Sequence, residues 1–278
     1  ALGRLLMRWL LALLVAAWVP LFLPPPVGVT GMLADDDVLA DEKQAPRGEA
    51  IACDLPWWIH QVGRVQGLRP AILGREDIDA CRRLLFRVFH EEIGWHPPAG
   101  NPSGLRVERE AGRMVDDYDD EAVWFGAYRG AALVACCRVI PPDPRRPLEV
   151  ARYTAIPAAI LDGALESNRL AVLRGHRGGG TFALVVLILW WIARRHGVQR
   201  ALITAEEPLS QKLYRPLGWD FTGVRFRYHP DDPHPCELLT MSPDGGHVVK
   251  SIARTVVRAV VRELPGGRAG PGDRRRTP

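Results

Sequence analysis

Residues 165–197 read LESNRLAVLRGHRGGGTFALVVLILWWIARRHG, in which a short apolar run passes through a glycine-rich turn into a longer apolar run. The first run, Leu165 to Leu173, has the length and composition of a buried strand. The second run, Phe182 to His196, is almost wholly apolar and stops before Gly197, as a buried helix does. A strand, a glycine turn and a helix in this order predict a mixed α/β domain.

Helix and strand patterns continue on both sides of this unit. Residues Glu76 to Ile93 repeat apolar positions at helical spacing and predict one amphipathic helix. Two β-rich runs, Ala122 to Tyr128 and Ala131 to Ile140, flank Arg129-Gly130 and predict a hairpin. Pro208 can open a helix, and three further strands are expected at Arg200 to Ala205, Phe221 to Tyr228 and Glu237 to Met241. We expect a mixed, mostly antiparallel twisted sheet with helices on both faces, splayed near the strand of Glu166.

The chain of 278 residues can bury one substantial core, and shifts in composition mark extensions of that core. Residues 69–245 hold the helix and strand patterns. Residues 32–68 are acidic and then mixed, and their prolines interrupt any periodicity, so they predict a linker or arm, with order beginning near Pro70. Residues 246–278 predict a basic amphipathic helix followed by a disordered basic tail.

Residues 1–31 form an apolar N-terminal segment, in which Arg4 and Arg8 precede an uncharged run from Trp9 to Ala34. This pattern predicts either an uncleaved membrane anchor or a mis-called start, with the true start near Met32. The first interpretation gives a membrane-associated protein, and the second gives a cytoplasmic one.

The formal net charge of +4 does not indicate a nucleic-acid-binding surface. The tail from Gly266 to Pro278 carries a net +3 and the two N-terminal arginines add +2, which leaves about −1 for the body. The five cysteines include no CxxC pair, and their odd number does not suit a disulfide framework. We therefore expect a reducing compartment, no metal and no nucleic-acid partner.

The glycine-rich turn is the first candidate for chemistry. Backbone N–H groups at a turn that opens a helix suit the phosphates and the pantetheine arm of a thioester acyl donor. Glycines let the chain approach such a ligand closely. A merely flexible turn would give the same local sequence.

Two segments together resemble the GNAT superfamily of acyltransferases. They are Leu170-Ala171-Val172 with Arg177-Gly178-Gly179-Gly180 four residues later, and Leu213-Tyr214-Arg215-Pro216-Leu217-Gly218-Trp219. The first looks like the acyl-CoA signature and the second like the tyrosine helix and LGF turn. The resemblance implies the GNAT fold, with Tyr214 as the acid that protonates the leaving thiolate. The residues it assigns to the thioester donor are Val172, Arg177, Gly178, Gly179, Gly180 and Thr181.

Phe182 departs from the GNAT pattern, because these proteins usually have a small residue at that position. The departure leaves two donors open, an acyl-CoA and an acyl-carrier-protein thioester.

The upstream half resembles the signature sequence of acyl-homoserine-lactone synthases, much of which N-acyl amino acid synthases share. Its parts are Arg87-Val88-Phe89, Trp95, Asp116-Asp117-Tyr118-Asp119, Cys137-Arg138-Val139-Ile140-Pro141 and Glu166-Ser167-Asn168-Arg169-Leu170. The likeness spans Ile72 to Met241 and implies that Phe89 and Trp95 belong to the substrate site. The lactone synthases carry an arginine four residues before that phenylalanine, where this chain has Leu85. Arg87 and Arg83 are candidates to replace it.

The charged members of this set also support a physical argument. Their burial without partners would be costly, and they lie on strand ends and one loop, so we expect them to converge. They are Asp116, Asp119, Glu166, Arg138 and Arg169. The carboxylates can hold a substrate ammonium, and an arginine can hold its carboxylate or lactone carbonyl. Glu166 can remove a proton from the amine, directly or through water. A structural ion-pair network is the alternative interpretation.

These observations predict an N-acyltransferase that moves an acyl group from an acyl-CoA or acyl-carrier-protein thioester to a small amino-acid-like amine. No activated nucleophile is evident, which favours direct attack by the amine. Two alternatives stay open: a GNAT acetyltransferase that uses acetyl-CoA, and a GNAT-like module that binds acyl-CoA without catalysis. The expected partners are the small amine, an acyl carrier protein and, through the N-terminus, a membrane.

Overall fold

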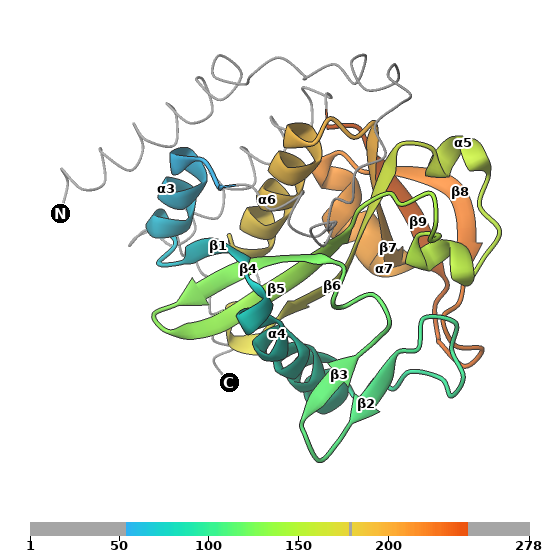
Figure 1. Ribbon diagram of the computed structural model, residues 1–278, viewed down its shortest axis with the longest axis horizontal. Coiled ribbons are helices and arrows are strands. Elements are labelled where there is room, and N and C mark those ends of the chain that lie inside the picture. The colour runs from blue at the N-terminus through green and yellow to red at the C-terminus, as the bar shows by residue number, and fades with distance from the viewer. Residues whose placement is uncertain (1–53, 178–179, 244–278) are drawn as a thin grey trace, which may run out of the picture.

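The computed structural model describes residues 54–177 and 180–243, which form one large mixed sheet with helices on both faces (Figure 1). Its strands are β1 (Arg69–Leu73), β4 (Val123–Arg129), β5 (Ala132–Ile140), β6 (Ala164–Val172), β7 (Arg200–Glu206), β8 (Asp220–Phe226) and β9 (Cys236–Met241). They run in the order β1-β4-β5-β6-β7-β9-β8, and every neighbouring pair is antiparallel except β6 and β7. The mostly antiparallel sheet predicted from the sequence is confirmed.

Helices α3 (Trp57–Val65) and α6 (Thr181–Arg195) cover one face of the sheet, and α4 (Ile78–Leu85) covers the other (Figure 1). Neighbouring side chains of β4 point to opposite faces of the sheet. Phe125 packs in the core under α6, whereas Trp124 packs in the core under α4. Two short helices, α5 (Ala158–Leu161) and α7 (Glu207–Leu209), lie in the connections. The almost wholly apolar sequence of α6 follows from its position, because eleven of its fifteen residues are buried.

Helix α3 corrects the expectation that order begins near Pro70. It starts after Pro56 and buries Ile59 and Val62 in the core shared with α6, while Trp57 is exposed. A nine-residue helix with so few buried positions is shorter than the window that periodicity needs. The other predictions for the ends of the chain, over residues 1–53 and 244–278, concern residues outside the described ranges. Within the described part, no helix is long and apolar enough to cross a membrane.

The helix predicted from Glu76 to Ile93 is continuous but changes its pitch. After α4, residues Phe86–Ile93 form π-helical turns that end at Gly94, where φ is 77°. The N–H of Trp95 then donates to the carbonyl of Phe89 over 2.9 Å, and the two rings lie 6.1 Å apart. The wide turns therefore bring together the two aromatic residues that the sequence assigned to the substrate site.

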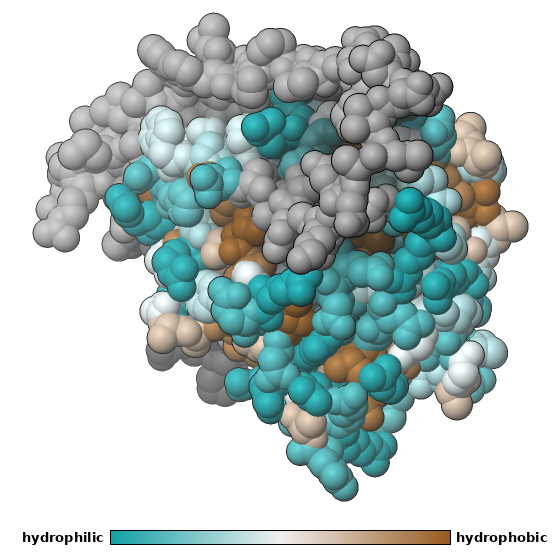
Figure 2. Space-filling model, in the orientation of Figure 1, coloured by the Kyte–Doolittle hydropathy of each residue, from teal (hydrophilic) through white to brown (hydrophobic). Residues whose placement is uncertain are grey.

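A hairpin of β2 (Arg106–Glu108) and β3 (Arg113–Val115) is tied to α4 on a mostly hydrophilic surface (Figure 2). Arg113 lies 3.0 Å from Asp79 of the helix and 2.7 Å from Glu108 of the hairpin. Solvent-exposed pairs of this kind contribute about 0–1 kcal/mol each. Their effect here is geometric, because β3 leads directly into Asp116.

Strands β6 and β7 separate after a short parallel contact. Residues Ala164–Glu166 pair with Arg200, Ala201 and Leu202, and no pairing continues beyond them. On its other side β6 carries a bulge opposite Cys137, and Arg169 within it has φ of 56°, the left-handed region. The splay expected near the strand of Glu166 is therefore present, and it opens the sheet over the site described below.

Gly126 marks a close approach between β4 and β5. A Cβ at this position would lie 2.2 Å from the main-chain oxygen of Ala135, which cannot move without breaking the ladder. We expect Gly126→Ala to lower the free energy of unfolding by about 1–3 kcal/mol, measured by urea denaturation. Gly175→Ala is the control, since a Cβ there meets nothing within 4 Å. Equal stability of the two variants would contradict the close approach.

Candidate active site

Arg138 of β5 lies at the centre of a fully buried cluster of charges. Its Nη1 donates to Asp116 and to Asp119, each over 2.6 Å, and its Nη2 donates to Glu149 over 2.6 Å. Its Nε donates to Oδ1 of Asn168 over 2.7 Å. The side chain is 0% exposed, so these bonds form in a medium of low polarity, where each is stronger than in water.

Arg169 closes the cluster from β6. Its Nε and Nη2 donate to Oδ2 of Asp116 over 3.1 and 2.8 Å, and Nη2 also donates to Glu149 over 2.5 Å. Burial raises the pKa of Asp116, but Arg138 and Arg169 outweigh it and hold this pKa below its usual value. The charged residues that the sequence expected to converge therefore do so.

Glu149 is a member of the cluster that sequence reasoning missed. It begins a single 3₁₀ turn, Glu149–Arg152, and its side chain is buried between Arg138 and Arg169. A lone glutamate after a proline-rich loop carries no pattern that would single it out. Only the fold brings it to the two arginines.

Glu166 is fully buried beneath the same cluster. Its Oε2 accepts a bond from the N–H of Val150 and its Oε1 one from Nδ2 of Asn168, both over 3.0 Å. Burial and the neighbouring Glu149 carboxylate raise the pKa of Glu166 to about 7. The acids of the cluster are Asp116, Asp119, Glu149 and Glu166, and its bases are Arg82, Arg138 and Arg169. The cluster is thus neutral when one acid, Glu166, keeps its proton.

Arg82 is the arginine of α4 that joins the cluster, and it lies three residues before Leu85. Its Nε lies 2.9 Å from Asp119 and its Nη2 lies 3.0 Å from Asp120. Arg83 instead pairs with Asp79 at 2.8 Å, away from the cluster, and Leu85 is buried in the core under α4. Arg82 joins the cluster and Arg83 does not, because position 82 lies one helical turn before position 85 on the same face of the helix. Arg87 is exposed, and its role stays a prediction.

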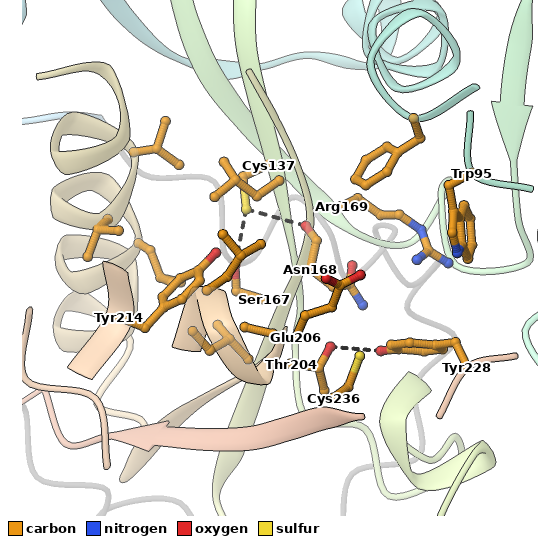
Figure 3. A pocket seen from close by; sticks show the side chains of 18 of the residues that line it. Trp95, Cys137, Ser167, Asn168, Arg169, Thr204, Glu206, Tyr214, Tyr228 and Cys236 are labelled. Carbon is orange, nitrogen blue, oxygen red and sulfur yellow. Dashed lines mark hydrogen bonds between the residues drawn. The ribbon is translucent and has the colours of Figure 1, made fainter. Parts of the chain in front are cut away.

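A cavity of about 360 Å³ opens where β6 and β7 separate (Figure 3). Its apolar walls include Leu170, Val185, Val186, Leu189, Ile203, Ala205, Leu209 and Trp219. Its polar lining includes Ser167, Asn168, Arg169, Thr204, Glu206, Tyr228 and Asp232. Phe89 and Trp95 line it as well, whereas Glu166 is not among the described lining residues. A proton can therefore pass between Glu166 and the cavity only through an intervening group.

Tyr214 lines the same cavity and directs its hydroxyl towards Cys137 and Ser167 (Figure 3). Its ring packs edge-on against Phe182 at 5.2 Å and Trp219 at 6.2 Å. Burial raises the pKa of Tyr214, so the phenol is protonated at neutral pH. Burial also raises the pKa of the Cys137 thiol to about 12, which leaves this cysteine a poor nucleophile.

Two residues of the predicted donor turn, Gly178 and Gly179, lie outside the described residues. Arg177 donates from Nε to the carbonyl of Val172 over 2.9 Å and forms an ion pair with Glu92. Gly180 stands before Thr181, the first residue of α6, and a Cβ on Gly180 would overlap the buried amide of Gln66. The described residues of this turn do not line the cavity, but Leu170, two residues before Val172, does.

Comparisons with known proteins bear on the fold. No protein-family model and no curated protein sequence matches this chain. Among solved structures it is similar to MesI, a CoA-dependent acyl-homoserine lactone synthase, with a TM-score of 0.50 and 17% identity over 68% of this chain and 95% of MesI. It is equally similar, with a TM-score of 0.50, to FeeM, an N-acyl amino acid synthase from uncultured soil microbes, with 15% identity over 64% of this chain and 92% of FeeM. The chain therefore has the GNAT fold and shares it with these two synthases.

Proposed function

We propose that this protein is an N-acyltransferase that moves an acyl group from a thioester donor to a small amine. The observation that carries the proposal is the cavity at the β6–β7 splay, whose lining combines apolar side chains, here called its apolar half, with a smaller set of polar side chains, here called its polar half, and a protonated tyrosine. The similarity in fold to a CoA-dependent synthase and to an N-acyl amino acid synthase supports the same chemistry. It favours coenzyme A over a carrier protein as the donor.

The acyl chain lies along the apolar half, and its thioester carbonyl lies at the β6 bulge. The amine binds in the polar half as an ammonium and releases one proton to solvent, and its nitrogen must lose a second proton as it bonds to the carbonyl carbon. Glu166 accepts this proton through a water molecule, since its carboxylate does not reach the cavity. The carbon–sulfur bond breaks, and the sulfur takes a proton from Tyr214 and leaves as a thiol. The proton held by Glu166 returns through water to the tyrosine.

Phe89 and Trp95 form the wall beside Arg169, against which the amine packs. Asp116, Asp119, Arg138 and Arg169 bond mainly to one another. They hold the polar half of the cavity in shape, and Arg138 also opposes the rise that burial and Glu149 cause in the pKa of Glu166. The two interpretations from the sequence, a substrate site and a structural network, are thus combined in one cluster.

The role of Tyr214 predicts a selective loss in one variant. Tyr214→Phe keeps the packed ring and removes the O–H, so kcat with an acyl-CoA should fall about 10²-fold. The loss should shrink with an aryl thioester, whose thiolate leaves without protonation. Both rates are measured as thiol release. Tyr128→Phe is the control, because Tyr128 lies on the outer strand pair of β1 and β4, where its hydroxyl donates to Asp77. An equal loss with both donors would remove the assignment of Tyr214 as an acid.

The experiment that tests the function uses the purified full chain with acyl-CoAs from acetyl to dodecanoyl and a panel of amines. Mass spectrometry of the products should show a new N-acyl amide that depends on a medium or long acyl chain. Products with acetyl-CoA alone would establish the acetyltransferase instead. Binding of acyl-CoA without any thiol release would establish the non-catalytic module.

A further inference from the structure

Arg169 is the one cationic side chain among the described residues that line the cavity, and its charge is already matched. It bonds to two carboxylates, Asp116 and Glu149, through Nε and Nη2. Only 12% of the side chain is exposed. A substrate carboxylate at this position would be a third anion around one guanidinium, and like charges in a buried site are costly.

Two further carboxylates line the polar half without a matching cation. Glu206 reaches into the middle of the cavity (Figure 3) and forms no ion pair with any residue of the described ranges. Asp232 accepts a hydrogen bond from the backbone N–H of His229 over 2.8 Å, and this neutral donor does not balance the negative charge of the Asp232 carboxylate. The nearby Arg227 is exposed, does not line the cavity and donates to the main-chain oxygen of Asp232.

The remaining groups of the polar half suit a cation and a neutral carbonyl. The ring of Tyr228, held by the 2.7 Å bond between its hydroxyl and Thr204, offers an aromatic face to an ammonium. Arg169 can donate from Nη1, which none of its bonds within the cluster uses. A carbonyl oxygen accepts such a bond without bringing a further negative charge.

From this distribution of charge we infer that the acyl acceptor is a cationic amine that has no free carboxylate. Its carboxyl group is absent or is masked as an ester, a lactone or an amide. The inference rests on the proposed N-acyltransferase function and names the substrate class of the same cavity. Glu206 binds the ammonium of the acceptor, and Arg169 bonds to its carbonyl oxygen.

Matched acceptor pairs test this class in the full-length protein with decanoyl-CoA as the donor. Phenylalanine methyl ester is compared with phenylalanine, and homoserine lactone with homoserine, by thiol release and product mass. We expect kcat/KM to be at least about tenfold higher for the ester and the lactone, the factor expected when a charged hydrogen bond replaces a repulsion. Equal or higher values for the free amino acids would overturn the inference.

Variants of Glu206 test the residue that makes the selection. Glu206→Gln should lower kcat/KM for the ester about tenfold, mainly through KM, and should lower it less for phenylalanine, because the same change also removes a repulsion from the phenylalanine carboxylate. Glu206→Lys should reverse the preference towards phenylalanine. Glu207→Gln is the matched control, because this neighbouring carboxylate does not line the cavity. A preference that survives in Glu206→Lys would assign the selection to another residue and contradict the proposed contact.

Calorimetry separates a failure of this inference from a failure of the proposed function. Binding of the ester and of phenylalanine is measured without a donor, so it needs no turnover. If no acyl-CoA is consumed with any amine but the ester still binds about tenfold more tightly, the charge selection stands and the transferase proposal fails. If acyl transfer occurs and both acceptors bind alike, the transferase stands and the charge selection fails.

Discussion

Replacing Arg138 with methionine is expected to lower the free energy of unfolding by about 3–5 kcal/mol at pH 7, because it leaves buried carboxylates without their cation. Three of them, Asp116, Asp119 and Glu149, bond to the Arg138 guanidinium at 2.6 Å. Urea denaturation followed by circular dichroism measures the loss. Arg138→Lys should lose less, since it keeps the charge while giving up the planar array of four bonds.

The pH dependence of this loss separates charge from packing. Carboxylates that lose their cation bind protons more tightly in the folded state than in the unfolded chain, so the folded variant gains stability as the pH falls. The difference from the unmodified protein should therefore shrink between pH 7 and about pH 5. Arg83→Met is the control, because its partner Asp79 is exposed and the loss should stay within about 1 kcal/mol. A loss from Arg138→Met that does not change with pH would point to packing alone.

Replacing Glu166 with glutamine is expected to lower kcat by about 10²–10⁴-fold, because the amine loses the base that accepts its proton. The pKa of Glu166, which is about 7 in the folded protein, sets the pH dependence of kcat in the unmodified protein. A base acts only when it is ionised, so kcat should fall as the pH drops below 7 and level off above it. The Glu166→Gln variant should keep a low kcat that does not change around pH 7.

Controls for Glu166→Gln must separate chemistry from folding. Glutamine matches the shape of glutamate, but its amide cannot accept from both Val150 and Asn168, so one buried bond is lost. This costs about 1–3 kcal/mol and is visible in the same urea titration. Binding of decanoyl-CoA should be unchanged. A folded variant with an unaltered pH profile would end the assignment of Glu166 as the base.

Much of the fold was predictable because its elements carry strong local patterns. The apolar length of α6 and the hairpin of β4 and β5 gave boundaries within one or two residues of the observed ones. Helix α3 was not predicted, because it has only nine residues, and the three of them that are buried, Ile59, Val62 and Gly63, span less than the window that a periodicity argument needs. The π-helical turns after α4 were hidden too, since the apolar spacing suits either pitch over such a short distance.

The candidate site was predictable where residues are contiguous in a motif and not where the fold alone joins them. Arg138, Arg169 and the two aspartates were found because they stand in a recognisable order along the chain. Glu149 and Glu206 were missed, because nothing local marks them. Glu166 was found, but its full burial, and hence the need for an intervening water, depends on how β6 packs against β7.

The position of Arg82 has a consequence for how such a site changes during evolution. Residues 82 and 85 are neighbours on one face of α4, and the cation on that face serves Asp119. An arginine at either position would lie on the side of the helix that meets this carboxylate. A chain that carried both arginines could lose one of them and still keep Asp119 paired, so the cation could change position by one helical turn without leaving a buried carboxylate without a cation.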